Sequence, residues 1–207
     1  KKKGAKTLLI NARISDKSYK SYKRFSFFYE RIFQNIDKVF AQSEVDKYRL
    51  EELGASNVEV IGNIKLAQLP KVNVELVKPK QVVITAASTH ENEEKLILNA
   101  YKKEQGKLII VPRHPERFDK IDLQIREFIK DKNISYQRYS VKDGFDSDII
   151  LVDKMGILND IYAISDVVIL GGAFEKIGGH NPIEPAFFNC KIISGKNIFN
   201  QKSLFDC

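Results

Sequence analysis

The stretch DVVILGGAFEKIGGHNPIEPAFF (166–188) joins an apolar strand, two glycine pairs and a short helix that follows an asparagine and a proline. An apolar, β-branched run that ends on glycines and leads into a capped helix is typical of one βα unit of a parallel sheet. The same alternation continues outward in both directions. The sequence therefore predicts an α/β fold of doubly wound, Rossmann-like parallel sheets.

Apolar, β-branched runs predict strands at 7–11, 38–42, 58–62, 82–87, 108–111, 134–139, 148–153, 166–171 and 191–195. Helical patterns lie between them, near 18–35, 43–53, 91–105, 116–131, 156–164 and 182–189. The stretch 65–80 carries two prolines and breaks the alternation, which is typical of a linker. We expect a first domain over 1–66, a linker over 67–80 and a second domain over 81–207. We also expect a fragment, with an incomplete first domain and a second domain truncated at its C-terminus.

The composition limits the class of protein. Of 207 residues, 43% are hydrophobic, which excludes a disordered chain. Thirty-four basic against 27 acidic residues give a formal charge of +7, which favours an anionic partner. No apolar run is long enough to span a bilayer, and the two cysteines lack the spacing of a zinc or redox pair.

The unusual polar residues follow the predicted strands, where doubly wound sheets bind ligands. Ser88 and Thr89 have the pattern of a helix cap before an acidic first turn, which leaves His90 unexplained. Arg113 and His114 lie in PRHPER (112–117), where Arg113 is either a surface ion-pair residue or, as we favour, an anion ligand. The single methionine, Met155, is either a core residue or packs against a base.

The segment GGHNPIEPA (178–186) predicts a nucleotide site. Gly178 and Gly179 allow close approach of a ligand, while Asn181 caps a helix whose first residue is Pro182. Glu184 would then accept hydrogen bonds from a ribose diol. The spacing matches neither a P-loop nor GxGxxG. His90, His114 and His180 lie on three loops that we expect to line one cleft, and no spacing favours a metal.

These motifs together resemble the 3-deoxy-D-manno-octulosonic acid (Kdo) transferases. The resemblance rests on NARIS (11–15), AQSEVD (41–46), GNIK (62–65), AASTHENEE (86–94), VPRHPERF (111–118), MG (155–156) and the GGAF and GGHNPIEPA segments. It implies a GT-B glycosyltransferase that moves Kdo from CMP-Kdo to a lipid A precursor, lipid IVA, with inversion. It implies no metal or other cofactor, no nucleic-acid partner, and a place at the cytoplasmic face of the inner membrane of Gram-negative bacteria.

The resemblance also implies roles for particular residues. Lys65, in GNIK, would stabilise the transition state, and the family's glutamate base has no counterpart in this sequence, so we expect the chain alone to bind CMP without transferring Kdo. The family usually has an acidic residue where this chain has Ile157. The CMP contacts carried over by motif are Pro112, Arg113, Met155, Gly156, Ile157, Asn181, Pro182, Ile183 and Glu184. Further candidates near the nucleotide are Ser88, Thr89, His114, Gly179 and His180.

Three alternatives stay open. One is a GT-B enzyme or epimerase that uses another nucleotide sugar. A second is a nucleotide-binding or lipid-surface module without catalysis. The third concerns YKSYKRFSFFYERIF (19–33), whose basic and aromatic residues at helical spacing suit either a helix covering the sheet or contact with an anionic lipid surface.

Overall fold

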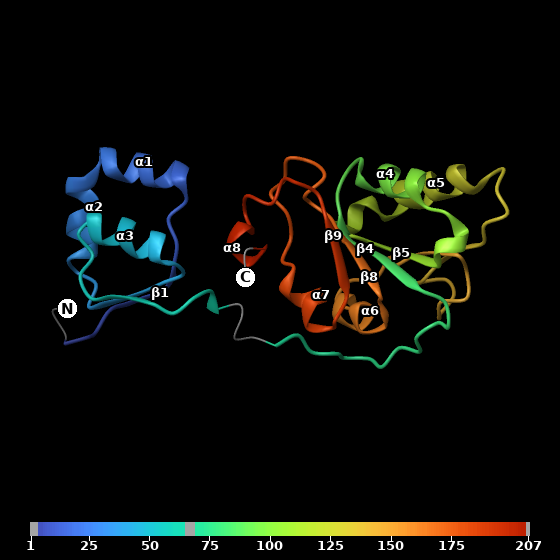
Figure 1. Cartoon of the computed structure of the whole chain (residues 1–207), viewed down its shortest axis with the longest axis horizontal. Helices are drawn as coiled ribbons and strands as arrows, with labels where there is room; N and C mark the ends of the chain where they lie inside the picture. The colour runs from blue at the N-terminus through green and yellow to red at the C-terminus, as the bar shows by residue number, and fades with distance from the viewer. Residues whose placement is uncertain (1–3, 65–68, 206–207) are drawn as a thin grey trace. The chain divides into compact units, whose positions relative to one another are not determined.

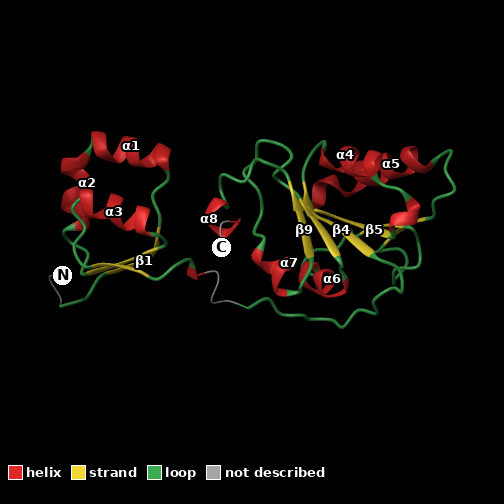
Figure 2. Ribbon diagram, viewed as in Figure 1, coloured by secondary structure: helices red, strands yellow, loops and turns green. Residues whose placement is uncertain are grey.

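The computed structural model describes residues 4–64 and 69–205. The chain divides into two compact units, Lys1–Gln68 and Leu69–Cys207. Each contains one parallel sheet (Figures 1 and 2). Every stretch predicted as a strand forms one, although several are shorter than expected. Within the described residues, no helix is both long and apolar enough to cross a membrane.

Unit 1 has a sheet of order β1-β2-β3 with all strands parallel. Its core packs buried residues of the sheet, such as Val39 and Ala41, against Phe33 and Leu50 of the helices. The elements are β1 (Leu8–Ala12), α1 (Asp16–Arg24), α2 (Ser26–Phe33), β2 (Lys38–Ala41), α3 (Glu44–Glu52) and β3 (Val58–Val60).

The single helix expected over 18–35 is two helices. Phe25 leaves the helical conformation, with φ −113° and ψ 36°, and its N–H bonds back to the carbonyl of Tyr22 as the cap of α1. The bend has a packing reason, because it brings the rings of Tyr22 and Tyr29 into a stack 4.1 Å apart. Tyr29 in turn stacks on Phe33, which reaches the core.

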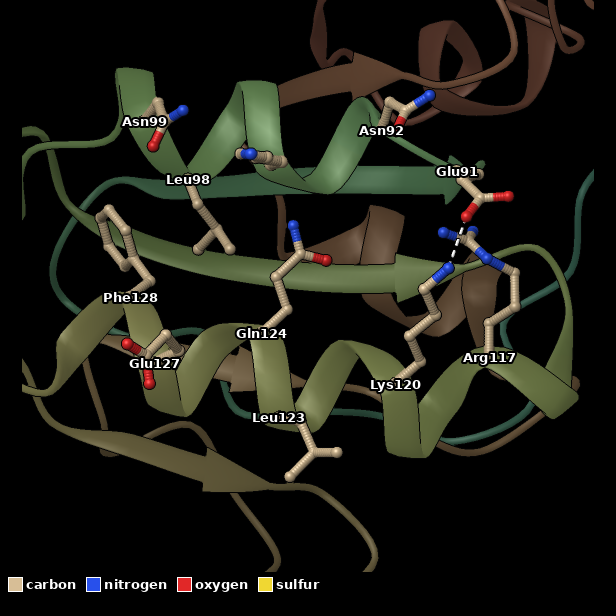
Figure 3. Close-up of a pocket in the computed structure, with 11 residues that line it drawn as sticks. Glu91, Asn92, Leu98, Asn99, Arg117, Lys120, Leu123, Gln124, Glu127 and Phe128 are labelled. Carbon is tan, nitrogen blue, oxygen red and sulfur yellow. Dashed lines mark hydrogen bonds and ion pairs between the residues drawn. The ribbon is translucent and has the colours of Figure 1, made fainter.

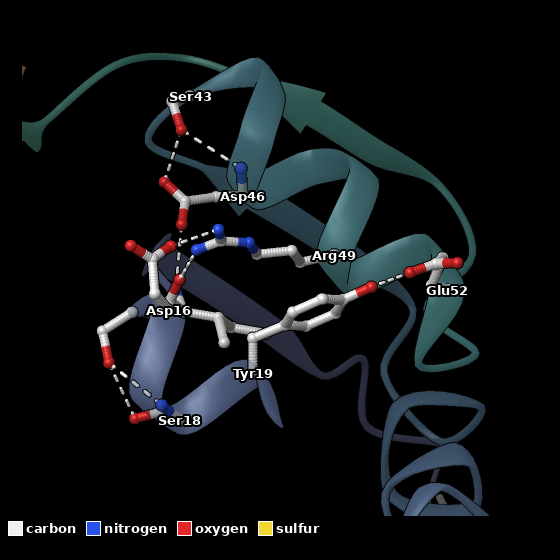
Figure 4. Close-up of polar contacts among 9 residues, drawn as sticks. Asp16, Ser18, Tyr19, Ser43, Asp46, Arg49 and Glu52 are labelled. Atoms are coloured by element: carbon white, nitrogen blue, oxygen red, sulfur yellow. Dashed lines mark hydrogen bonds and ion pairs between the residues drawn. The ribbon is translucent and has the colours of Figure 1, made fainter. Parts of the chain in front are cut away.

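A polar cluster joins the start of α3 to the turn before α1 (Figure 4). Ser43 Oγ accepts from the N–H of Asp46 at 3.1 Å, so Ser43 caps α3. The buried Asp46 carboxylate accepts from Ile14 N at 2.8 Å, and Arg49 donates to Ile14 O at 2.6 Å. Both polar groups of the Ile14 backbone are thereby satisfied.

Unit 2 contains a six-stranded sheet of order β6-β7-β5-β4-β8-β9, all parallel. Helices α4 and α5 cover one face and α6 and α7 the other (Figure 1). Its strands are β4 (Val83–Thr89), β5 (Lys107–Pro112), β6 (Tyr136–Arg138), β7 (Ile149–Leu151), β8 (Val167–Leu170) and β9 (Lys191–Ser194). Its helices are α4 (Glu93–Ala100), α5 (Phe118–Ile129), α6 (Leu158–Ile164), α7 (Ile183–Phe187) and α8 (Lys202–Phe205).

The four helices predicted in unit 2 are all shorter than their patterns, and two of the patterns divide into a helix and a 3₁₀ turn. The pattern over 91–105 is α4 followed by an extended Tyr101 and a 3₁₀ turn at Lys103–Gln105. The pattern over 116–131 begins with a 3₁₀ turn at Pro115–Arg117, and α5 starts at Phe118. Proline cannot donate the hydrogen bond that a preceding helical turn would need, so it lies at the entry.

The stretch predicted as a linker is not described at 65–68, and residues 69–82 contain no helix or strand. The described part belongs to unit 2 and packs along it. Asn73 N donates to Asp160 Oδ1 at 2.6 Å, Leu76 packs on the core beside α6, and Lys78 pairs with Asp166 at 2.6 Å.

Candidate nucleotide site at the switch point of unit 2

The order of strands in unit 2 reverses beside β4. The chain runs from β4 to its neighbour β5, continues to β6 and β7 on that side, and then crosses to β8 on the other side of β4. Loops leaving β4 and β8 at their carboxyl ends therefore diverge to opposite faces and open a crevice there. The residues singled out in the sequence must lie at this edge if they form one site.

Ser88 and Thr89 do not cap a helix, contrary to the prediction. They are the last residues of β4, at 7% and 0% exposure, and α4 begins only at Glu93, after Asn92. The ladder to β5 shifts between Ala87 and Thr89 as Ser88 turns to φ 52°. Thr89 Oγ1 is buried without a hydrogen-bond partner among the described residues.

A buried carboxylate holds the two sides of the switch point together. Glu93, 1% exposed, accepts from His90 N at 2.9 Å and from Gly172 N at 2.9 Å. Its other oxygen accepts from Phe174 N at 3.1 Å. One side chain of α4 thus satisfies three N–H groups on the loops after β4 and β8. Sequence reasoning missed this residue, because a glutamate in a first helical turn has the same pattern when it is exposed.

The three histidines converge, as expected. His90 Nε2 lies 2.8 Å from His180 Nε2, and the two rings are nearly parallel at 5.1 Å. The ring of His114 meets that of His90 edge to face at 5.4 Å. Burial is the main cause that lowers the pKa of His180, to about 4, and His90 and Arg113 lower it further. Burial also lowers the pKa of His90.

The glycines of this region leave room for the contact between His90 and His180. Gly172 has φ 75°, and a Cβ there would lie 2.9 Å from Cδ2 of His180. Gly179, at φ 79°, donates its N–H to Gly172 O at 2.7 Å. A side chain at Gly172 would displace the His180 ring, so the glycine is needed for the histidine pair.

Arg113 lies at the carboxyl end of β5, at the edge of the sheet where the sequence predicted it. It follows the buried Pro112 at the end of β5, and its N–H donates to Thr89 O at 3.0 Å. Its side chain is exposed and makes no hydrogen bond or ion pair with any described residue. The ion-pair alternative therefore fails for Arg113, whereas Arg117 fills that role. Arg117 forms two hydrogen bonds, of 2.9 and 2.8 Å, with the buried Glu94.

The segment after β7 lies at the same edge of the sheet, because β7 neighbours β5. Met155 is 55% exposed, so the core alternative is wrong for its side chain. Gly156 has φ 84° and precedes Ile157, whose side chain is 8% exposed and packs in the core beside α6. Ile157 can therefore meet a ligand only through its backbone.

Helix α7 starts one residue later than predicted. Pro182 is its cap and Ile183 its first residue, while Asn181 Oδ1 accepts from Ile183 N at 3.1 Å. Asn181 Nδ2 donates to Glu184 Oε1 at 3.1 Å. The short side chains of the turn thus orient Glu184, which is half-buried. Its second oxygen makes no hydrogen bond with a described residue.

A separate groove of about 630 Å³ runs along α4 and α5 (Figure 3). Lys120 and Glu91 form an exposed ion pair across it. It contains none of the predicted site residues. Lys65, the predicted transition-state stabiliser, lies outside the described residues. Within the described ranges, no group of three or more His, Cys, Asp or Glu side chains is arranged to hold a metal ion.

Comparisons with known proteins indicate a family for this chain. A family model described as 3-deoxy-D-manno-octulosonic-acid transferase (kdotransferase) matches residues 1–68. A bifunctional glycosyltransferase/methyltransferase of Fusobacterium nucleatum is 37% identical over 214 residues, covering 96% of this chain and 33% of that protein. A 3-deoxy-D-manno-octulosonic acid transferase of Rickettsia felis is 37% identical over 207 residues, covering 93% of this chain and 44% of that protein. The chain thus spans less than half the length of these curated relatives.

Among solved structures, the chain is similar to the C-terminal CMP-Kdo binding domain of WaaA from Acinetobacter baumannii. The identity is 34% and the TM-score 0.50, with 61% of this chain and 67% of that one covered. The parallel α/β units and this similarity define the class as a glycosyltransferase of GT-B type. Within that class, the chain belongs to the 3-deoxy-D-manno-octulosonic acid transferase family.

Proposed function

We propose that this protein serves the transfer of Kdo from CMP-Kdo to a lipid A precursor, lipid IVA, and that unit 2 binds the donor. The observation that carries the proposal is the convergence of the loops after β4, β5 and β8 at the switch point, where His90, His114 and His180 meet. The similarity to a CMP-Kdo binding domain supports the choice of donor.

The proposed nucleotide contacts surround that point. Arg113 offers to the phosphate a guanidinium that pairs with no described residue. Glu184 offers to the ribose diol the carboxylate oxygen that accepts no hydrogen bond from a described residue. Backbone groups of 155–157 approach the base. Pro112, Asn181, Pro182 and Ile183 shape the two sides of the pocket, as the family resemblance assigns.

In the proposed reaction, an acceptor hydroxyl attacks the anomeric carbon of Kdo and loses its proton. The bond from that carbon to the phosphate oxygen breaks, CMP leaves, and the configuration inverts. Negative charge grows on the phosphate as the bond breaks, so a preorganised cation beside it lowers the barrier. Arg113 supplies such a cation from unit 2, and the resemblance assigns a similar role to Lys65. Because the family's glutamate base has no counterpart in the sequence, we propose that these residues alone bind CMP without transfer.

The nucleotide preference tests this proposal. Calorimetric titrations with CMP, UDP and GDP, at equal ionic strength, should give the tightest binding for CMP. Tighter binding of UDP or GDP would favour a GT-B enzyme of another donor, and binding of none of the three would contradict a nucleotide site.

We propose that helices α1 and α2 of unit 1 touch an anionic membrane surface. Phe27 is 69% and Phe28 54% exposed, and the exposed Lys17, Lys20 and Arg24 lie on the preceding helix. Apolar rings beside basic side chains suit the headgroup region of a bilayer. Sedimentation with vesicles should show binding to anionic but not zwitterionic lipid, and weaker binding by Phe27→Ser. Equal sedimentation with the two lipids would contradict it.

A further inference from the structure

We propose that the His90–His180 pair, with His114 beside it, is an anion subsite of the donor site, and that it takes up a proton when an anion binds. This deepens the proposed function and rests on it. The anion has the chemistry of a phosphate or a carboxylate, and a nucleotide-activated sugar acid carries both groups.

The geometry of the pair requires a shared proton. Two imidazole nitrogens 2.8 Å apart cannot both be protonated or both be bare, so one Nε2 donates and the other accepts. This bond is possible when both rings are neutral, and also when one ring carries a second proton on Nδ1. The pair therefore accepts one positive charge without breaking. Only a second positive charge would force the rings apart.

The charged groups around the pair only partly balance a proton on it. From α4, the Glu93 carboxylate faces the pair and raises the pKa of both histidines, less than burial lowers it, and its oxygens already accept from three backbone N–H groups. Glu94 is neutralised by its two hydrogen bonds with Arg117. From the loop after β5, Arg113 adds positive charge that disfavours protonation of His180.

The same surroundings explain why the pair takes up a proton only when a ligand binds. Burial lowers the pKa values of both His90 and His180, so the pair is neutral near pH 7 in the free protein. An incoming anion would reverse the local charge balance and raise both pKa values.

The test is calorimetry at pH 7.5 in two buffers, HEPES and Tris, that differ in ionisation enthalpy. Three ligands are compared. CMP carries only the phosphate, and cytidine carries neither anion. Free Kdo carries the carboxylate and is added in the presence of saturating CMP or saturating cytidine. We expect proton uptake with CMP, with Kdo or with both, and none with cytidine. Affinity for the anion that is bound should rise as pH falls, by up to about tenfold per pH unit for each proton.

The double variant His90→Gln/His180→Gln identifies the group that takes up the proton. CMP can itself gain a proton on its phosphate, and that contribution persists in the double variant, whereas uptake by the pair disappears. Imidazole NMR shifts of the unmodified protein provide a second measurement, because His90 or His180 should move toward the protonated form as the anion is added. Equal proton uptake by the two proteins, or unmoved imidazole shifts, would overturn the subsite while CMP binding still supports the proposed function. Absence of CMP binding would instead contradict the proposed function.

Discussion

At the residue scale, Arg113 is the test of the phosphate contact. Its guanidinium makes no bond with a described residue, so its removal should not affect folding. Arg113→Ala should weaken CMP binding by about 1–3 kcal/mol, the range for a charged hydrogen bond, with an unchanged melting temperature. Arg126→Ala, which removes the same charge from α5, is the control for long-range electrostatics. Equal losses of affinity in the two variants would remove Arg113 from the site.

Glu184 is predicted to bind the ribose diol. Glu184→Gln keeps the shape and removes the charge, and ribose hydroxyls donate more strongly to a charged acceptor. Calorimetry should compare CMP with an analogue that lacks both the 2′ and 3′ hydroxyls. The unmodified protein should lose affinity on that change, and Glu184→Gln should lose much less. Parallel losses would show no coupling, and Glu184 would then only hold Asn181.

The histidine pair predicts a pH dependence of stability. Burial lowers the pKa of His180 from 6.5 to about 4 and lowers that of His90, so the unfolded chain binds more protons between these values. The free energy of unfolding should therefore decrease as the pH falls from about 6.5 toward 4. Denaturant titrations at several pH values should show a smaller decrease for His180→Gln. An equal decrease would mean that other groups cause the slope.

At the element scale, a buried ion pair joins α4 to the start of α5. Glu94 is 1% exposed, and Arg117→Ala would leave its carboxylate buried without its partner. The loss of stability should be about 3–5 kcal/mol, measured by chemical denaturation. Lys120→Ala is the matched control, because it breaks the exposed pair between Lys120 of α5 and Glu91 in the turn before α4 (Figure 3) and should cost about 0–1 kcal/mol. Similar losses would contradict this difference.

The elements were predictable where a local signal exists. Apolar β-branched runs mark the strands other than β6 (Tyr136–Arg138), and a serine followed by carboxylates in the first helical turn is a signal of the kind that begins α3 at Ser43. The bend at Phe25 was not predictable, because the sequence on both sides of Phe25 has helical spacing. The stacking of Tyr22 on Tyr29 stabilises the bend. The prediction that Ser88 and Thr89 cap a helix was wrong because pairing with β5 extends β4 to Thr89. Glu93 was missed because two of its three N–H partners, Gly172 and Phe174, lie on a loop far along the chain.

At the scale of the whole molecule, the candidate site was predictable as a set of loops. Parallel strands bring their carboxyl ends to one edge, so His90, His114 and His180 were expected near one another, and they meet. The direct contact of two imidazoles required side-chain packing that spacing does not encode. It depends on Gly172, which leaves room for the His180 ring.

The central claim is that the loops at the switch point of unit 2 bind the nucleotide. Backbone amide NMR of the ¹⁵N-labelled protein, recorded during a CMP titration, tests it most directly. The account predicts that the largest shifts fall on Arg113, Gly156, Gly172 and the segment 179–184. Unit 1 and the outer groove between α4 and α5 should be little affected. Saturable shifts confined to that groove, around Leu123 and Phe128, or to unit 1, would contradict the claim.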